Sequence, residues 1–146
     1  MRHLILLSML VTVFSVSNTN AGEASGEASR IGQGKAVEQF DPEQGFKLSS
    51  KAMKSMGVKF QALSGKGPWK VPKSSLMTLK QSDAVYRLYD GWISMVLVKV
   101  VSADKDTVMV KAEDLETGDQ VAVEGVTFLR MTDSDLNAGT VDSCAH

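Results

Sequence analysis

The pattern of hydrophobic and polar positions predicts a series of short β-strands in the middle of the chain. Val58, Phe60 and Ala62 are separated by single polar residues, and this period of two is typical of a half-buried strand. The run 92–101 is apolar at most positions, and its β-branched residues favour a strand over a buried helix. We therefore expect residues 92–101 to form the central strand of the core.

Turn signals divide the neighbouring sequence into further strands. Asp90-Gly91 separates residues 84–89 from residues 92–101, and Asp-Gly between two β-prone runs is the signature of a type I′ hairpin turn. Glycine suits this turn because it tolerates positive φ. Other short strands, one of them at an edge, are expected at residues 69–72, 107–112 and 120–124.

Helical signals are confined to two short segments. Ser49 or Ser50 is a suitable cap for a helix over residues 51–56, and Gly57 lies where a left-handed residue would end it. Residues 126–131 are expected to form a helical turn. The predicted fold is therefore mainly β, a small β-barrel or β-roll of about six short strands with one or two short helical segments.

The first 21 residues have the pattern of a secretory signal peptide. Arg2 precedes an apolar run over residues 4–16, and small residues lead to Ala21, after which we expect cleavage. The apolar run is shorter than the roughly 20 residues that cross a bilayer. The alternative is an uncleaved membrane anchor. With cleavage, the mature chain is expected to be periplasmic, close to the membrane but not spanning it.

Shifts in composition give the expected domain boundaries. Residues 22–45 are rich in Gly, Glu, Ala and Ser and are expected to form a flexible tether. Residues 46–131 carry the strand pattern and are expected to form the folded domain. Residues 132–146 are expected to form a polar C-terminal tail.

The composition excludes several classes of function. A chain of 146 residues has the size of one domain, which excludes a two-domain enzyme. Its 16 Lys and Arg residues balance 17 Asp and Glu residues, and this balance argues against generic nucleic-acid binding. One cysteine and two histidines cannot form a four-ligand zinc site or an internal disulfide. We expect no enzymatic activity, no catalytic residue and no cofactor.

The last five residues contain the candidate metal site. Asp142, Cys144 and His146 alternate with small residues, so in an extended chain all three side chains point the same way. Their carboxylate, thiolate and imidazole groups suit copper or zinc. The alternative is a tail with one free thiol, and an oxidising compartment also permits an intermolecular disulfide through Cys144.

Two other groups of residues have both a functional and a structural interpretation. Met53 and Met56 are soft ligands for copper(I), but their spacing of three on a helix also places side chains onto a core. Four lysines form a locally basic region that suits either an acidic partner or a solvated face: Lys47, Lys51, Lys54 and Lys59.

Four segments occur in an order that is found in one family of envelope proteins. Residues 48–58 combine Leu-Ser, a short helix and Gly-Val, and residues 71–76 run from Val-Pro to Leu. Residues 84–91 combine Val-Tyr with Asp-Gly, and residues 113–125 contain Gly-Asp, two valines and a closing glycine. Together they resemble the membrane-proximal domain of periplasmic adaptor proteins, the membrane-fusion proteins of RND-type efflux pumps.

The resemblance implies a stand-alone module that docks on an inner-membrane transporter, an efflux adaptor or another pump component. In the adaptors, a lipoyl domain, a helical hairpin and a β-barrel domain separate the first two segments, whereas here only residues 64–70 join them. Bridging to an outer-membrane channel is therefore not implied. The alternative function is a periplasmic metal-binding or metal-delivery protein that uses the C-terminal residues and the two methionines.

Overall fold

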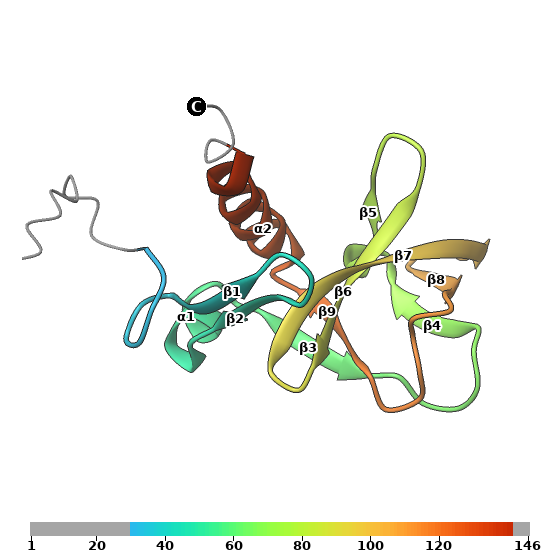
Figure 1. The fold of residues 1–146 in the computed structure, drawn as a ribbon. Coiled ribbons are helices and arrows are strands. Elements are labelled where there is room, and N and C mark those ends of the chain that lie inside the picture. Colours follow the sequence, from blue (N-terminus) through green and yellow to red (C-terminus); the bar gives the residue numbers. More distant parts are fainter. Residues whose placement is uncertain (1–29, 142–146) are drawn as a thin grey trace, which may run out of the picture.

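The structure, a computed structural model, describes residues 30–141. These residues form a mainly β fold, as predicted, with nine strands, two α-helices and one 3₁₀ turn (Figure 1). In chain order the elements are β1 (Val37–Asp41), β2 (Gly45–Leu48), α1 (Ser50–Ser55), β3 (Lys59–Ala62), β4 (Trp69–Pro72), η1 (Lys73–Ser75), β5 (Met77–Thr78), β6 (Asp83–Tyr89), β7 (Trp92–Ala103), β8 (Thr107–Lys111), β9 (Gln120–Glu124) and α2 (Val126–Val141).

The strands form one antiparallel sheet with a branch. Its main path runs β1-β2-β7-β6-β9-β3, while β8 pairs with β7 and β4, and β5 pairs with β6. β7 pairs with β6 as far as Val98 and with β8 from Lys99 onward. Through this change of partner β8 and β4 form a branch, and β3 and β4 each pair with one strand only. The described sheet has nine strands rather than about six, and it is not closed into a barrel.

Two apolar clusters occupy the two faces of the sheet. In β6, Ala84 and Tyr86 face one cluster and Val85 faces the other, as expected from the alternation of side chains along a strand. The helix-side cluster lies under α2 and comprises Val37, Phe46, Leu48, Ala52, Met77, Ala84, Tyr86, Ile93, Ala122, Val126 and Leu129. The roll-side cluster comprises Leu63, Trp69, Val71, Val85, Val96, Val98, Val108, Val110, Leu115 and Val121.

The local signals in the sequence are confirmed. Asp90 and Gly91 have φ values of 47° and 78°, as the predicted hairpin turn requires. The Ser49 hydroxyl accepts a hydrogen bond from the N–H of Ala52 at 3.2 Å and caps α1. Gly57 follows the helix with a φ of 63°.

The structure corrects both expected domain boundaries. β1 pairs with β2 and Val37 is buried, so residues 37–45 belong to the sheet and not to a tether. α2 extends the expected helical turn to Val141, and Leu136 packs against the helix-side cluster. The composition of each segment is polar on average, but β1 is paired with β2 along its length and α2 is joined to the sheet by apolar contacts and by the hydrogen bond between Tyr86 and Asp133. Residues 22–29 and 142–146 lie outside the described residues.

Residues 92–101 form a strand inside the sheet, as predicted, but its apolar side chains are buried over only part of its length. Ile93, Val96 and Val98 are buried, whereas Leu97 and Val101 are each 58% exposed. Leu97 pairs with Ala84 and therefore lies on the face of the helix-side cluster. The exposure of Leu97 shows that the helix-side cluster covers only the first part of β7 on this face.

Among residues 30–141, neither helix is long and apolar enough to cross a membrane.

A buried tyrosine fixes α2 against the sheet. The Tyr86 hydroxyl donates a hydrogen bond to Asp133 Oδ2 at 2.9 Å, and the Asn137 side chain donates to Asp133 Oδ1 at 2.9 Å. Burial of the phenol raises the pKa of Tyr86 well above its ordinary value, and the charge of Asp133 and the hydrogen bond to it act in the same direction. Arg130 opposes them. The neutral phenol is therefore part of the folded state.

The domain is expected to lose stability as the pH rises above about 10, where an exposed tyrosine releases its proton. Above about pH 10 the unfolded chain releases the Tyr86 proton while the folded state retains it, so rising pH favours unfolding. Below this pH both states keep the proton, and the group does not change the stability. The Tyr86→Phe variant should lose less stability between about pH 9 and about pH 11. Urea midpoints across this range measure the difference.

The matched control for the alkaline effect is Tyr89→Phe, because Tyr89 is an exposed tyrosine at the end of the same strand. This variant should show the same alkaline loss as the unaltered chain. Equal pH profiles for Tyr86→Phe and Tyr89→Phe would contradict the assignment.

Candidate functional site

The residues proposed from sequence as metal ligands form two sets, of which the structure describes one. Asp142, Cys144 and His146 lie outside the described residues. Met53, in α1, and Met56, the residue that ends this helix, are half-buried and pack against the helix-side cluster, as the packing interpretation expects. Within residues 30–141, no group of three or more His, Cys, Asp or Glu side chains is arranged to hold a metal ion.

The locally basic region is partly engaged in contacts. The Lys47 ammonium lies 4.7 Å from the centre of the Trp92 ring, and Lys59 forms an ion pair with Glu124 at 2.8 Å. Lys51 and Lys54 are exposed on α1. These two remain available to an acidic partner.

The aspartates near turns have structural contacts. Asp119 is 7% exposed, and its carboxylate accepts the N–H of Glu116 at 2.9 Å and lies 3.7 Å from the Arg87 guanidinium. Arg87 also donates to the carbonyl of Asp114 at 2.7 Å. These contacts hold the loop between β8 and β9, so the turn interpretation of Gly118-Asp119 accounts for the carboxylate.

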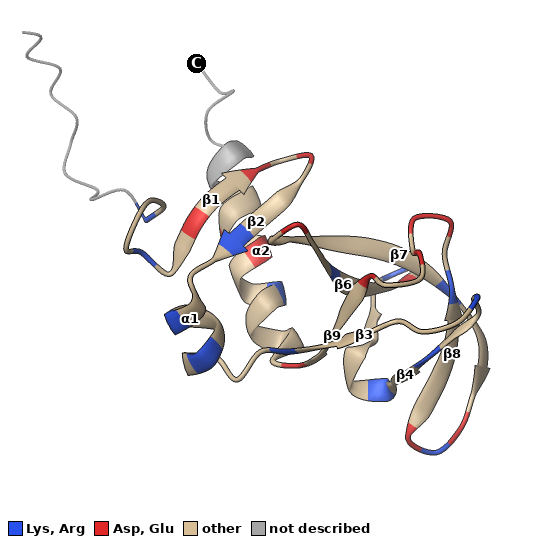
Figure 2. Ribbon diagram, turned by 90° about the horizontal axis from the view of Figure 1, so that it is seen from below, with Lys and Arg blue, Asp and Glu red and all other residues tan. Residues whose placement is uncertain are grey.

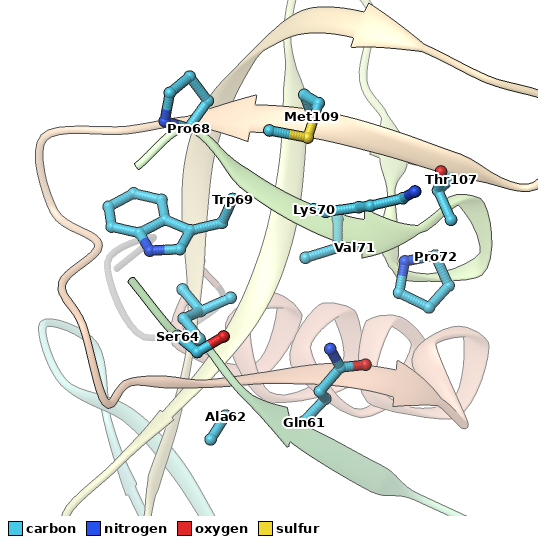
Figure 3. Close-up of a pocket in the computed structure, with 11 residues that line it drawn as sticks. Gln61, Ala62, Ser64, Pro68, Trp69, Lys70, Val71, Pro72, Thr107 and Met109 are labelled. Carbon is cyan, nitrogen blue, oxygen red and sulfur yellow. The ribbon is translucent and has the colours of Figure 1, made fainter. Parts of the chain in front are cut away.

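A groove of about 450 Å³ lies between β3 and β4, each of which pairs with one strand only (Figure 3). We call it the seam groove. Its lining residues come from β3, the loop after it, β4 and β8: Gln61, Ala62, Leu63, Ser64, Pro68, Trp69, Lys70, Val71, Pro72, Thr107 and Met109. Its volume is within the range of about 300–1,000 Å³ typical of ligand sites.

The seam groove has an apolar floor and polar walls. Leu63 and Val71 are buried members of the roll-side cluster, while Gln61, Ser64 and Lys70 are exposed. In Figure 3, Trp69 and Ser64 lie toward the end where β3 and β4 are connected, and Gln61 and Pro72 lie toward the other end. The groove can therefore take a ligand with apolar groups inward and polar groups outward.

Hydrogen bonds fix the connected end of the seam groove. The carbonyl of Gly65 accepts the Trp69 indole N–H at 3.3 Å and the Thr117 hydroxyl at 2.6 Å. The loop after β3 is thereby tied both to β4 and to the loop before β9. This end is the closed end of the groove.

A second hollow, of about 850 Å³, lies where β7 changes partner. Charged side chains of both signs line it, among them Asp83, Lys99, Lys111 and Glu113. Leu97 and Val100 supply its apolar surface. We take the smaller seam groove as the candidate site, because its walls are two strand edges that have no strand partner among the described residues.

The sequence carries a charge signal that extends well beyond the four lysines considered above. Residues 44–82 contain no Asp or Glu and eight lysines: Lys47, Lys51, Lys54, Lys59, Lys66, Lys70, Lys73 and Lys80. This stretch includes both walls of the seam groove. Figure 2 shows lysines along α1 and acidic residues in loops around β6, β7 and β8. A balanced net charge therefore conceals a strongly basic segment.

Comparisons with protein-family models, with curated proteins and with solved structures found no match to this chain. The resemblance to efflux adaptors thus stays a prediction from four short segments.

Proposed function

We propose that this protein is an exported, non-enzymatic binding module that docks on an inner-membrane transporter or on another component of an envelope pump. The proposal joins the export signal expected at the N-terminus to the adaptor-like segments of the domain. It assigns the domain a role in protein–protein contact and no role in chemistry.

The observation that carries the proposal is the meeting of the four adaptor-like segments in one sheet. The first segment leads directly into β3, and β3 pairs with β9 of the last segment over residues 59–62 and 120–124. β9 also pairs with β6, which comes from the third segment. Segments that resemble one family in order thus form one contiguous body, as a stand-alone unit of that family requires.

The second adaptor-like segment, residues 71–76, contacts the same sheet through the 3₁₀ turn η1. The Ser74 hydroxyl donates to the carbonyl of Val123 in β9 at 3.0 Å. The loop between β3 and β4 spans only residues 63–68, so within this proposal the insertions of the larger adaptors are replaced by a short connection. The proposed role is accordingly docking alone.

Affinity purification from envelope fractions after mild crosslinking tests the proposal. We expect the tagged, full-length protein to recover an inner-membrane transporter, an adaptor or another pump component, because a docking module forms a specific complex there. The same tag on an unrelated exported protein gives the background. Recovery of no such component, from a protein that is exported and stable as a monomer, would overturn the proposal.

A further inference from the structure

We propose that the seam groove binds an extended, acidic segment of a partner protein, which lies between β3 and β4 as an added strand. This inference rests on the proposed function as a binding module and names the chemistry of its partner. Strand addition at a free sheet edge gives affinity through backbone hydrogen bonds and specificity through alternate side chains.

The backbone of β3 presents free hydrogen-bonding groups to the groove. Leu63 donates its N–H to the carbonyl of Asp119 at 2.7 Å and accepts the N–H of Gly118 at 2.9 Å, so its backbone faces the β9 side. Successive residues of a strand direct these groups to opposite edges. The neighbouring residue, Ala62, therefore directs its N–H and C=O into the seam groove.

The backbone of β4 faces the groove in the same way. Lys73 donates its N–H to the carbonyl of Asp106 at 3.0 Å, on the side of β8. By the same alternation Val71 also faces β8, and Lys70 directs its N–H and C=O into the groove. Pro72 has no N–H to leave unpaired, which suits a free edge. An extended segment in the groove thus meets donors and acceptors on both walls.

The side chains around the groove define the pattern of the occupant. Val71 is 2% exposed and points into the roll-side cluster, whereas Lys70 points outward to solvent. A strand added beside β4 repeats this alternation, so its inward residues are apolar and its outward residues lie next to Lys70.

Charge selects acidic residues for the outward positions. Lys70 is the one charged side chain among the described residues that line the groove, and Lys66 and Lys73 flank β4 on either side. Glu124, an acidic residue next to β3 across the sheet, is neutralised by Lys59 at 2.8 Å. Opposite charges on neighbouring strands attract and like charges repel. The occupant is therefore acidic.

The same charge argues against a second copy of this chain as the occupant. Pairing of two β4 edges would bring two copies of the basic strand together, and an edge lysine is a common device against such self-association. The ends of the described chain also lie away from the groove. Figure 1 shows the start of the described residues beside β1 and the end of α2 on the far side of the sheet from β4.

A synthetic peptide tests the inference directly. The probe is an eight-residue peptide of alternating Glu and Val with blocked ends, titrated onto the exported chain at low salt. We expect saturable binding and slower hydrogen–deuterium exchange of the backbone amides that face the groove, those of Ala62 and Lys70. An alternating Lys and Val peptide should give neither effect. Exchange of the Ala62 and Lys70 amides that is already slow without peptide would instead indicate occupation by the chain itself and overturn the proposal.

Matched variants separate the charge contribution from a general electrostatic effect. Lys70→Glu is expected to weaken binding of the acidic peptide about five- to tenfold, because it replaces attraction by repulsion at an exposed position. Lys80→Glu makes the same change in net charge at an exposed lysine outside the groove and should alter binding less than twofold. Equal effects of the two variants would overturn the assignment to the groove.

A change in the peptide tests strand addition without altering the protein. Methylation of alternate backbone nitrogens removes donors from one edge of the peptide and keeps its charge. We expect the methylated peptide to give no added protection of the Ala62 and Lys70 amides. Equal binding of both peptides would show that backbone pairing is not the mode of binding.

The inference and the proposed function fail in different ways. A photoreactive residue in place of Gln61, which lines the groove, should crosslink the acidic segment of the envelope partner. If the partner is recovered by general crosslinking but not from this position, and no acidic peptide binds, the groove assignment is wrong and the docking function stands. If acidic peptides bind but no pump component is ever recovered, the docking function is wrong and the groove assignment stands.

Discussion

Replacement of Phe46 by alanine is expected to lower the free energy of unfolding by about 3–5 kcal/mol, since the change removes a buried aromatic ring and leaves a cavity. Phe46 has no exposed surface, and its ring meets that of Tyr86 edge to face, with centres 6.4 Å apart and an interplanar angle of 70°. It also pairs with Ile93 where β2 joins β7. Urea denaturation followed by circular dichroism measures the loss.

The size of this loss matters because small domains are stable by only about 5–15 kcal/mol. Phe128→Ala is the matched control, since Phe128 is 50% exposed on α2 and the chemical change is the same. This variant should change the free energy of unfolding by less than about 0.5 kcal/mol. Similar losses for the two variants would show that Phe46 does not occupy the core as the structure has it.

Gly45→Ala is expected to cost about 3 kcal/mol or more, because it combines a strained backbone with a steric collision. Gly45 begins β2 with a φ of 99°, a conformation that L side chains rarely adopt. A Cβ atom there would collide with the carbonyl oxygen of Ile93 and lie 3.1 Å from the Cα of Ser94. β7 cannot move away easily, because it is paired with β6 along this stretch. Thermal and urea unfolding measure the cost.

Gly34→Ala separates the two contributions. Gly34 has a φ of 78°, but a Cβ added there would meet no heavy atom within 4 Å. Only the backbone strain remains, so we expect a loss of about 1 kcal/mol. If Gly45→Ala cost no more than Gly34→Ala, the close approach of β2 to β7 in the structure would be contradicted.

The elements that sequence patterns predicted correctly are those that depend on neighbouring residues. Asp90-Gly91 forms its turn because the two residues themselves tolerate positive φ. Ser49 caps α1 because its hydroxyl reaches an N–H three residues away. Such features need no information from distant parts of the chain.

The boundaries of the domain depend on contacts that are distant in sequence. Val37 is held in the sheet because β1 pairs with β2. α2 continues past the predicted turn because Leu136 packs against the helix-side cluster and Asp133 accepts a hydrogen bond from the buried Tyr86. An average of polarity over 10 to 20 residues cannot show that one residue reaches a core. The ends of the domain were therefore the least predictable part of the fold.

The candidate site was also beyond prediction from local pattern. The sequence drew attention to Asp142, Cys144 and His146, because metal ligands are recognisable one residue at a time. A groove between strand edges has no such signature, since it arises where β3 pairs with β9 and β4 pairs with β8, leaving the facing edges open. Only the run of eight lysines without an acidic residue was visible in advance.

By itself the sequence determined the fold class, the central hairpin, the cap of α1 and the basic character of residues 44–82, because each is a property of adjacent side chains and backbone preferences. Only the tertiary structure decided which strands pair, where the domain begins and ends, and that the sheet stays open between β3 and β4. The physical reason is that strand pairing satisfies backbone groups common to every residue, so the choice among partners is made by the packing of the whole core.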